Sequence, residues 1–418
     1  MENSGACQGL TRPIRCIVKL VYSSMRGAGG AAITCKNELE KINEENLGTV
    51  SSQLRQAMSS GPDSQKILGM DWSKRPGESE LCCDVGGFYD QISCDSSNFV
   101  VVHGAGSFGH FQASKSGVHK GGLDKSLVKA GFVATRISVT TLNLEIVRAL
   151  AAAGIPSVGM SPFSCGWLTS ERNLESADLS MVVKAIESGF VPCLRFGCLL
   201  LRFCMEMLSL IVNWSVSSVK IWIIRLKRHL CINLLLTRHL LQLWFHNKGC
   251  TILSGDVIIK HLAAYLKPEY VIFLVSFFKD SICMVSYSYT TFLSCLSHDC
   301  LLKTDVFGVY DRPPSEPEAV LLREIAVTEE GSWSVVKPNY GSTNKPVEIT
   351  VAAHDTTGGM VTKIAEAAMI AKLGIDVYIV KAATSHSQRA LSGEIRRGSI
   401  PDDWLGTVIK FAGKPAQH

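Results

Sequence analysis

The sequence predicts an α/β fold with a largely parallel sheet that helices cover on both faces. Short apolar runs of strand length alternate with longer segments whose apolar residues recur at helical spacing. Alternating strands and helices are typical of parallel sheets, because the crossover helices pack on the two faces. With 418 residues, 46% of them hydrophobic, the chain is long enough to bury a sizeable core.

The first half of the chain contains the clearest predicted elements. Residues 14–20, IRCIVKL, and residues 98–102 are apolar runs that predict buried strands. Helices are predicted over 37–58 and 123–153, and the intervening residues 60–96 are rich in Gly, Ser, Pro and Asp, which predicts a surface loop. The apolar positions of the second helix are Leu123, Leu127, Ala130, Val133, Leu142, Ile146, Val147 and Leu150.

The second half continues the alternation. A glycine and a proline, Gly154 and Pro156, end the long helix before the next short apolar run. From there the pattern predicts, in order, a strand at 157–160, a helix at 179–188, a strand that begins at 190, a helix at 256–266, a strand at 270–274, a helix at 362–373 and a strand at 376–380.

Three stretches break this rhythm: 21–28, 193–248 and 275–303. The second is rich in Leu, Cys, Trp, Ile and Arg and contains a 17-residue run, 203–219, whose only charge is Glu206. That run is the one candidate for a membrane span, but it is short and holds a glutamate, so we expect no stable span.

Charge and cysteine content exclude several classes of partner. The formal net charge is +5, yet residues 193–248 alone carry eight Lys/Arg and one Glu, so the positive charge is local and predicts no nucleic-acid partner. The fifteen cysteines form no C-x-x-C pair and no zinc-type spacing with histidine. The N-terminus has no apolar signal segment. These features predict a cytoplasmic protein.

The segment VVHGAGSFGH, 101–110, carries the most functional information. A strand runs into a loop with three glycines, Gly104, Gly106 and Gly109, and His110 closes the loop. Successive backbone N–H groups in such a loop form a concavity that suits a phosphate, and the histidine adds a donor that can carry charge near neutral pH. A tight structural turn is the alternative interpretation.

Further residues suited to phosphoryl transfer lie near the ends of other predicted strands or at helix starts. Phosphoryl transfer requires cations and backbone donors around the moving group. Lys19 ends the first strand, and Asp256 begins a helix, where it can also act simply as an N-terminal carboxylate. TGGMVTK, 357–363, opens a helix with glycines and a lysine, a combination that binds anions. No Walker A loop is present, which disfavours a P-loop enzyme.

In this order, the motifs resemble the amino acid kinase superfamily, and within it the isopentenyl phosphate kinases of plant and archaeal type. The segments that carry the resemblance are KL with GGAAITCK (19–20 and 29–36), HGAGSFGH (103–110), GMSPFS (159–164), ILSGD (252–256), TDVFGVYD (304–311) and GGMVTK (358–363). The resemblance implies a single three-layer αβα sandwich over 1–418. It also implies transfer of the ATP γ-phosphoryl group to isopentenyl monophosphate, with ATP and Mg²⁺ required, and a possible homodimer.

The resemblance also implies roles for individual residues. The acceptor phosphate would be bound by Ala105, Gly106, Gly109 and His110. Catalysis would depend on Lys19, Lys36, His110 and Asp256, with Asp256 orienting the lysines. The nucleotide would be held by Lys19, Gly29, Gly30, Asp305, Gly308, Gly359 and Lys363. The prenyl tail would need an apolar pocket, for which the helices after His110 and residues 160–162 are candidates.

The chain departs from the family pattern at the three odd stretches. No His-Gly-Asp turn follows Pro192, and insertions separate Lys19 from Gly29 and the strand at 270–274 from TDVFGVYD. Natural insertions usually lie at exposed loop tips. We therefore interpret 21–28, 193–248 and 275–303 as translated non-coding sequence, from retained introns or a mispredicted gene, and expect poor folding or weak activity of the chain as written.

Three alternatives remain open at this level. The chain could be a relative that phosphorylates another small phosphate, phosphonate or carboxylate. It could be a non-catalytic or non-expressed product of the same gene, as the missing His-Gly-Asp turn suggests. A protein anchored in a membrane through 203–219 is the third possibility.

Overall fold

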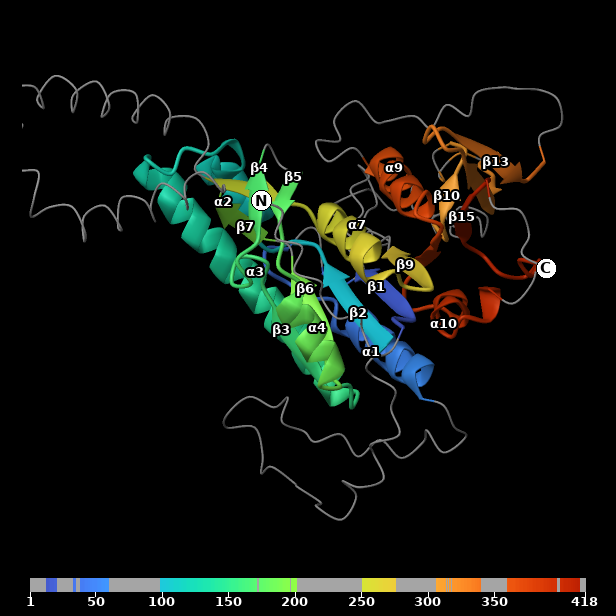
Figure 1. Cartoon of the computed structure of the whole chain (residues 1–418), viewed down its shortest axis with the longest axis horizontal. Helices are drawn as coiled ribbons and strands as arrows, with labels where there is room; N and C mark the ends of the chain where they lie inside the picture. The colour runs from blue at the N-terminus through green and yellow to red at the C-terminus, as the bar shows by residue number, and fades with distance from the viewer. Residues whose placement is uncertain are drawn as a thin grey trace, which may run out of the picture.

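The computed structural model has an α/β architecture built on one large sheet (Figure 1). It describes residues 13–20, 33–34, 38–59, 98–170, 173–195, 197–200, 250–275, 306–312, 314, 316, 318–339, 359–396 and 399–413. Within these ranges, strands and helices alternate along most of the chain, as predicted.

Nine strands form the central sheet, in the order β13-β12-β15-β14-β9-β1-β2-β6-β3. Their bounds are β1 Cys16–Leu20, β2 Phe99–His103, β3 Ser157–Met160, β6 Val191–Arg195, β9 Tyr270–Val275, β12 Glu324–Val327, β13 Trp333–Lys337, β14 Asp376–Lys381 and β15 Thr407–Phe411. All pairs from β3 to β14 are parallel, and antiparallel pairing occurs at β14/β15 and β12/β13. Three two-stranded ribbons pair β4 (Leu168–Ser170) with β5 (Asn173–Ser176), β7 (Gly197–Leu200) with β8 (Cys250–Leu253) and β10 (Val309–Tyr310) with β11 (Leu321–Leu322).

Helices pack on both faces of the sheet and create two separate hydrophobic cores. The helices are α1 Glu44–Met58, α2 His110–Ser116, α3 Ser126–Ala152, α4 Ser180–Glu187, α7 Gly255–Leu266, α9 Gly359–Ala371 and α10 Ser385–Leu391, with 3₁₀ turns at Val118–Lys120 and Glu394–Arg396. Side chains of α4, α7 and α9 share one core with Ile17, and those of α1, α3 and α10 share the other with Cys16 and Val18. Because side chains alternate across a strand, β1 contributes to both cores.

The predicted α/β class is confirmed, and most predicted elements are found within a few residues of their expected bounds. The helix expected over 37–58 begins at Glu44, because the Asn43 side chain accepts a hydrogen bond from the Asn46 N–H and caps the helix there. In α3, Leu142, Ile146 and Leu150 are buried as expected.

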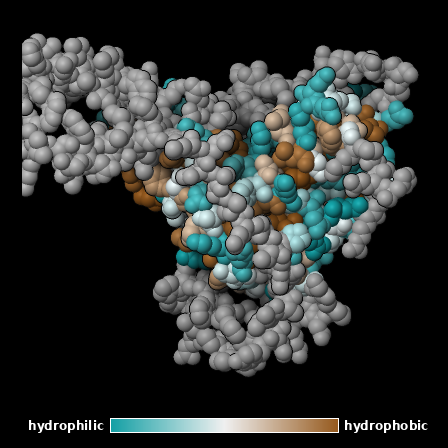
Figure 2. Space-filling model, in the orientation of Figure 1, coloured by the Kyte–Doolittle hydropathy of each residue, from teal (hydrophilic) through white to brown (hydrophobic). Residues whose placement is uncertain are grey.

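The first part of α3 differs from the sequence prediction. Leu127 and Val133 belong to the apolar stripe that was expected to face the core, yet both are exposed. Ile137 and Leu144 are exposed along the same helix, and the buried positions are instead Val128, Gly131, Thr135 and Ser138. Figure 2 shows apolar surface along the edge of the molecule near α3. Helical spacing therefore identified the helix and the core-facing side of its second half, but not that of its first half.

The first residues of 193–248, the stretch interpreted above as translated non-coding sequence, belong to the fold. Cys193 and Leu194 are buried in β6, where they pair with β2 and β3. Residues 197–200 form β7, which pairs with β8 so that Leu200 lies opposite Cys250. Residues 193–195 and 197–200 of that stretch are therefore part of the described fold, and the non-coding origin of the remainder stays a prediction. Most of 193–248, all of 21–28 and 276–303, and the loop 60–96 lie outside the described residues.

No helix in the described part of the chain is long and apolar enough to cross a membrane. The candidate span 203–219 lies outside that part.

Candidate active site

The candidate active site lies where β1, β2 and β9 end. The register pairs Leu20 with His103 on one side and with Leu274 on the other, so the three parallel strands finish at one edge. In the sheet, β1 lies between β2 and β9. The strand that follows β1 along the chain, β2, is its neighbour on one side, and the much later β9 is its neighbour on the other side. Open α/β sheets bind ligands at such a switch point, outside the carboxyl ends of the strands.

Lys19 is the central cation of this edge. It shares the sheet face of Ile17, which α7 and α9 cover, and its side chain is only 5% exposed. Its ammonium group lies 4.7 Å from the centre of the Phe273 ring on the neighbouring strand. A lysine buried this deeply requires charged partners, because an unpaired charge away from water is unfavourable.

Asp256 is the first of these partners. The Ser254 side chain accepts a hydrogen bond from the Val257 N–H and begins α7 at Gly255, which places Asp256 in the first turn. The Asp256 carboxylate forms an ion pair with the Lys19 ammonium. A Cβ at Gly255 would lie 3.8 Å from Lys19 Cε and 3.9 Å from Gly104 N, so the start of α7 contacts both the lysine and the glycine loop.

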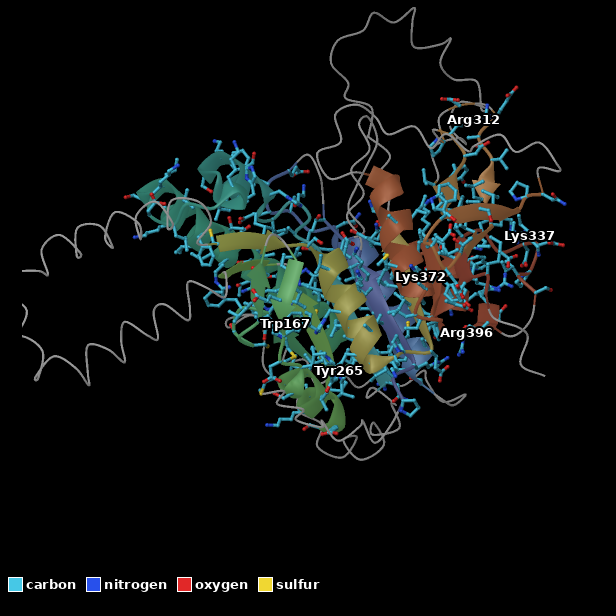
Figure 3. The ribbon with its side chains drawn as sticks, turned by 45° about the horizontal axis from the view of Figure 1, so that its top comes forward. Trp167, Tyr265, Arg312, Lys337, Lys372 and Arg396 are labelled. Atoms are coloured by element: carbon cyan, nitrogen blue, oxygen red, sulfur yellow. The ribbon has the colours of Figure 1, made fainter. Side chains whose placement is uncertain are left out.

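A second carboxylate comes from α9, which lies beside α7 (Figure 3). Glu366 Oε2 is 3.8 Å from Lys19 Nζ, and Lys363 lies one turn earlier on the same helix and is also buried. Trp167, labelled in Figure 3, packs edge-on against His261 of α7 at 5.8 Å between ring centres and supports this helix from its other side. Two lysines and two carboxylates therefore gather at the end of β1.

Burial and the neighbouring charges set the protonation of this cluster. Burial lowers the pKa of Lys19 to about 7; the Glu366 carboxylate raises it, and the Lys363 ammonium lowers it. Burial likewise raises the pKa of Glu366, against the opposing effect of the two lysines. Lys19 is therefore poised between its charged and neutral forms near neutral pH, as perturbed groups in functional sites often are.

The glycine loop follows β2 and adopts a tight, well-supported turn. Gly106 and Gly109 have φ angles of 57° and 72°, in the left-handed region that favours glycine. A Cβ at Gly106 would lie 2.3 Å from Thr34 Oγ1, so no larger residue fits there. Thr34 Oγ1 also accepts a hydrogen bond from the Ser107 N–H at 3.2 Å.

The N–H groups of the loop divide into two sets. Those of Ser107, Phe108 and Gly109 are used inside the protein; the Gly109 N–H donates to Ser138 Oγ at 2.9 Å. Within the described residues, no hydrogen bond involves the N–H of Ala105 or Gly106. Two of the three predicted phosphate-binding backbone groups thus fit the role, whereas the N–H of Gly109 is already occupied and this glycine serves the turn.

His110 is the first residue of α2 and is exposed at the surface. The protein around it removes enough water to lower its pKa below the usual value. This shift favours the neutral imidazole, which has one N–H donor.

The structure gathers some of the predicted site residues and does not describe others. Lys19, Asp256 and Lys363 come together, and the glycine loop lies against them through Gly255. Gly308 packs against Thr407, where a Cβ would meet Oγ1 at 2.6 Å, so a side chain does not fit at this position. Gly359 begins α9. The predicted residues outside the described part of the chain are Gly29, Gly30, Lys36 and Asp305.

Sequence reasoning missed Glu366 and the residues beneath the glycine loop. Glu366 lies three positions after Lys363 in a predicted helix, so the two share one face. This i, i+3 spacing was the sequence signal that could have identified Glu366 as a neighbour of Lys363. Asn143, which contacts His103, lies within a long helix and carries no local motif.

Comparison with known proteins agrees with this geometry. Residues 85–197 and 294–381 match the model of the amino acid kinase family. The chain is 57% identical over 404 residues to an isopentenyl phosphate kinase of Arabidopsis thaliana, covering 96% of this chain and 97% of the relative. It is 29% identical over 308 residues to an isopentenyl phosphate kinase of Methanothermobacter thermautotrophicus, covering 72% and 84%. A solved structure titled "X-ray structures of isopentenyl phosphate kinase" superposes with a TM-score of 0.52 at 23% identity, over 95% of this chain and 100% of that one.

The fold and the site together define a kinase of the amino acid kinase class: a mostly parallel sheet between helical layers, with buried lysines and a glycine loop at one edge. Within that class, the chain belongs to the isopentenyl phosphate kinase family.

Proposed function

We propose that this chain transfers the γ-phosphoryl group of ATP to isopentenyl monophosphate, giving isopentenyl diphosphate and ADP. The observation that carries the proposal is the charged cluster around Lys19, which lies against a glycine loop ending in His110. Membership of the isopentenyl phosphate kinase family supports the choice of acceptor.

Each group has a distinct task in this proposal. The Lys19 ammonium stabilises the negative charge on the moving phosphoryl group, and the Asp256 carboxylate holds that ammonium in place. The N–H groups of Ala105 and Gly106 bind the acceptor phosphate together with the imidazole of His110. Lys363, at the start of α9, holds nucleotide phosphates. In this proposal Lys36 takes part in catalysis, and the nucleotide is also held by Gly29, Gly30 and Asp305.

ATP is the phosphoryl donor in this proposal, and Mg²⁺ accompanies it. The described part of the chain contains no group of three metal-ligating side chains, so the protein itself builds no complete metal cage there. Mg²⁺ in kinases is usually held by substrate phosphates with one or two carboxylates and several waters. Bound in that way, the ion would neutralise phosphate charge, while Lys19 and the loop N–H groups act on the transferring and accepting groups.

The direct test is an acceptor comparison with the purified chain and radiolabelled ATP. We expect label transfer to isopentenyl monophosphate and none to glutamate or carbamate. A preference for a carboxylate acceptor would replace this proposal by that of a relative with another small-molecule substrate.

A second candidate is an inactive product of the same gene, and the interrupted motifs favour it. The match to the amino acid kinase model breaks off at residue 197 and resumes at 294, a gap that holds most of the two longer odd stretches. Sequencing the transcript distinguishes the candidates: an active enzyme encoded with all three stretches in frame would exclude the non-coding interpretation.

The proposal includes a homodimer in the cytoplasm. Leu127, Val133, Ile137 and Leu144 are exposed along α3, and apolar patches of this kind often mark association surfaces. Light scattering tests the dimer, with a monomer mass as the contrary result. Cell fractionation tests the location, with recovery in membranes as the contrary result.

A further inference from the structure

Directly beneath the glycine loop lies a buried histidine that the proposed chemistry does not use. His103 is the last residue of β2, and only 1% of its surface is exposed. It occupies the same side of the strand as Val101, the side that α3 covers, and therefore faces away from Lys19. Its ring cannot touch the phosphoryl group from there, yet its backbone continues directly into the loop.

Both ring nitrogens of His103 are hydrogen-bonded, each to a group that determines the direction of the bond. Nδ1 lies 2.8 Å from the carbonyl oxygen of Gly104, which can only accept, so Nδ1 carries the proton. Nε2 lies 2.9 Å from Asn143 Nδ2, which donates to it. The same amide nitrogen donates its other hydrogen to the Cys193 carbonyl at 3.1 Å, so the orientation of the amide is determined independently.

These bonds connect the interior of the protein to one peptide plane of the loop. The Gly104 carbonyl and the Ala105 N–H belong to the same planar trans peptide and point in opposite directions. When His103 holds the carbonyl on the α3 side, the Ala105 N–H must lie on the other side. This N–H makes no hydrogen bond within the described residues.

We propose that His103 is a positioning residue for the acceptor phosphate: its Nδ1–H fixes the peptide between Gly104 and Ala105 so that the Ala105 N–H meets the phosphate. Asn143 serves the same purpose one step deeper, because it selects the tautomer with the proton on Nδ1. The inference rests on the proposed function, since it assigns a task within that phosphate site.

The protonation of His103 agrees with this role. Burial lowers its pKa to about 4, the hydrogen bond to Gly104 opposes that shift, and the charge of Arg195 adds to it. The ring is therefore neutral throughout the physiological range, and its hydrogen bonds do not change with pH there.

Two substitutions separate positioning from simple packing. An asparagine amide lies at the distance of Nδ1 from the backbone, so His103→Asn keeps a donor for the Gly104 carbonyl. A glutamine amide reaches the position of Nε2, so His103→Gln keeps a partner for Asn143 but loses the Nδ1 donor. We expect His103→Gln to raise KM for isopentenyl monophosphate about five- to tenfold, the equivalent of one hydrogen bond, with KM for ATP unchanged. His103→Asn should retain a KM near that of the unmodified chain.

Equal increases in KM for the two variants, or a parallel increase in KM for ATP, would show that His103 only fills space. The tautomer is tested without turnover by ¹⁵N NMR of the histidine side chains in the full chain, with His103→Gln identifying the signal. A proton on Nε2 would overturn the inference. If the unmodified chain transfers no phosphoryl group to isopentenyl monophosphate, the proposed function fails, whereas the NMR result still decides how the peptide is held.

Discussion

Glu366 Oε2 lies 3.8 Å from the Lys19 ammonium, so a carboxylate on α9 acts on the lysine that ends β1. The two residues are 347 positions apart in the sequence, and only the packing of α9 beside α7 brings them together. Asp256 already pairs with Lys19 from α7. The second carboxylate has an effect of its own: burial lowers the pKa of Lys19, and the charge of Glu366 partly opposes that shift.

Replacing Glu366 by Gln should shift the pH dependence of catalysis. Lys19 must be protonated to stabilise phosphoryl charge, so kcat/KM should fall as the pH rises through its pKa, about 7 in the free protein. Glu366 raises that pKa, so its loss lowers the pKa, and the falling limb of the kcat/KM profile should move to lower pH. Glu187→Gln, an exposed change on α4, is the matched control. An unmoved limb in Glu366→Gln contradicts the assignment.

Lys19→Met should reduce kcat about 100- to 1000-fold, the usual cost of removing one group that stabilises transition-state charge. Methionine has a similar length and tolerates burial, but it leaves the Asp256 and Glu366 carboxylates without their cation, so we also expect a lower melting temperature. Single-turnover measurements with saturating ATP isolate the chemical step. Retention of near-normal turnover in this variant would remove Lys19 from the catalytic set.

His110→Ala should weaken binding of the acceptor and leave binding of ATP unchanged. A hydrogen bond to a charged group contributes about 1.5–3 kcal/mol, so KM for isopentenyl monophosphate should rise roughly 10- to 100-fold. Titration calorimetry with each substrate separately measures the two affinities. His119→Ala, a nearby histidine, is the control; an equal effect there would indicate a general electrostatic change.

Much of the fold could be predicted, because the buried parallel strands are continuous apolar runs. β1, β2, β9 and β14 all have this pattern. The short ribbon β10–β11 and the hairpin β12–β13 could not, because they are only two to five residues long and partly exposed. The side of the first half of α3 that faces the protein could not be predicted either, because its residues there are small or polar. They are Gly131, Thr135 and Ser138, and they contact α2 or the glycine loop.

Site residues could be predicted from the sequence only where they belong to a local sequence motif. Lys19, Asp256 and the glycine loop stand in recognisable local patterns, and the structure brings them to one edge. Glu366 and Asn143 act through tertiary contacts with residues 347 and 40 positions away, and no local pattern reports such distances. Gly308 also has a packing reason to be glycine, because Thr407 leaves no room for a side chain, and its predicted role in nucleotide binding stays a prediction.

Gly106→Ala should destabilise the glycine loop. The backbone is left-handed, and the new methyl group would overlap Thr34 Oγ1, so we expect a loss of about 1–3 kcal/mol in the free energy of unfolding. Denaturant titration measures the change. The double variant with Thr34→Ala removes the overlapping atoms and should recover part of the loss. A double variant with strictly additive effects would show that the two residues do not interact.

Removing the odd stretches should restore the enzyme, and the structure defines where to cut. Leu200 and Cys250 are register partners at the ends of β7 and β8, so an Asn-Gly turn can replace 201–249 and close a two-residue hairpin. Val275 is a buried residue of β9 that pairs with Lys381, so the third cut begins after it; deleting 21–28 and 276–303 as well joins Lys19–Leu20 to Gly29 and Val275 to Thr304. Because a displacement of about 1 Å at a reacting group can cost ~100-fold in rate, kcat/KM should rise by at least that order relative to the full chain. A variant carrying only the hairpin replacement separates the effect on folding yield from the effect on the strand ends. Equal turnover of the full and shortened chains would mean that the three stretches are tolerated parts of a working enzyme.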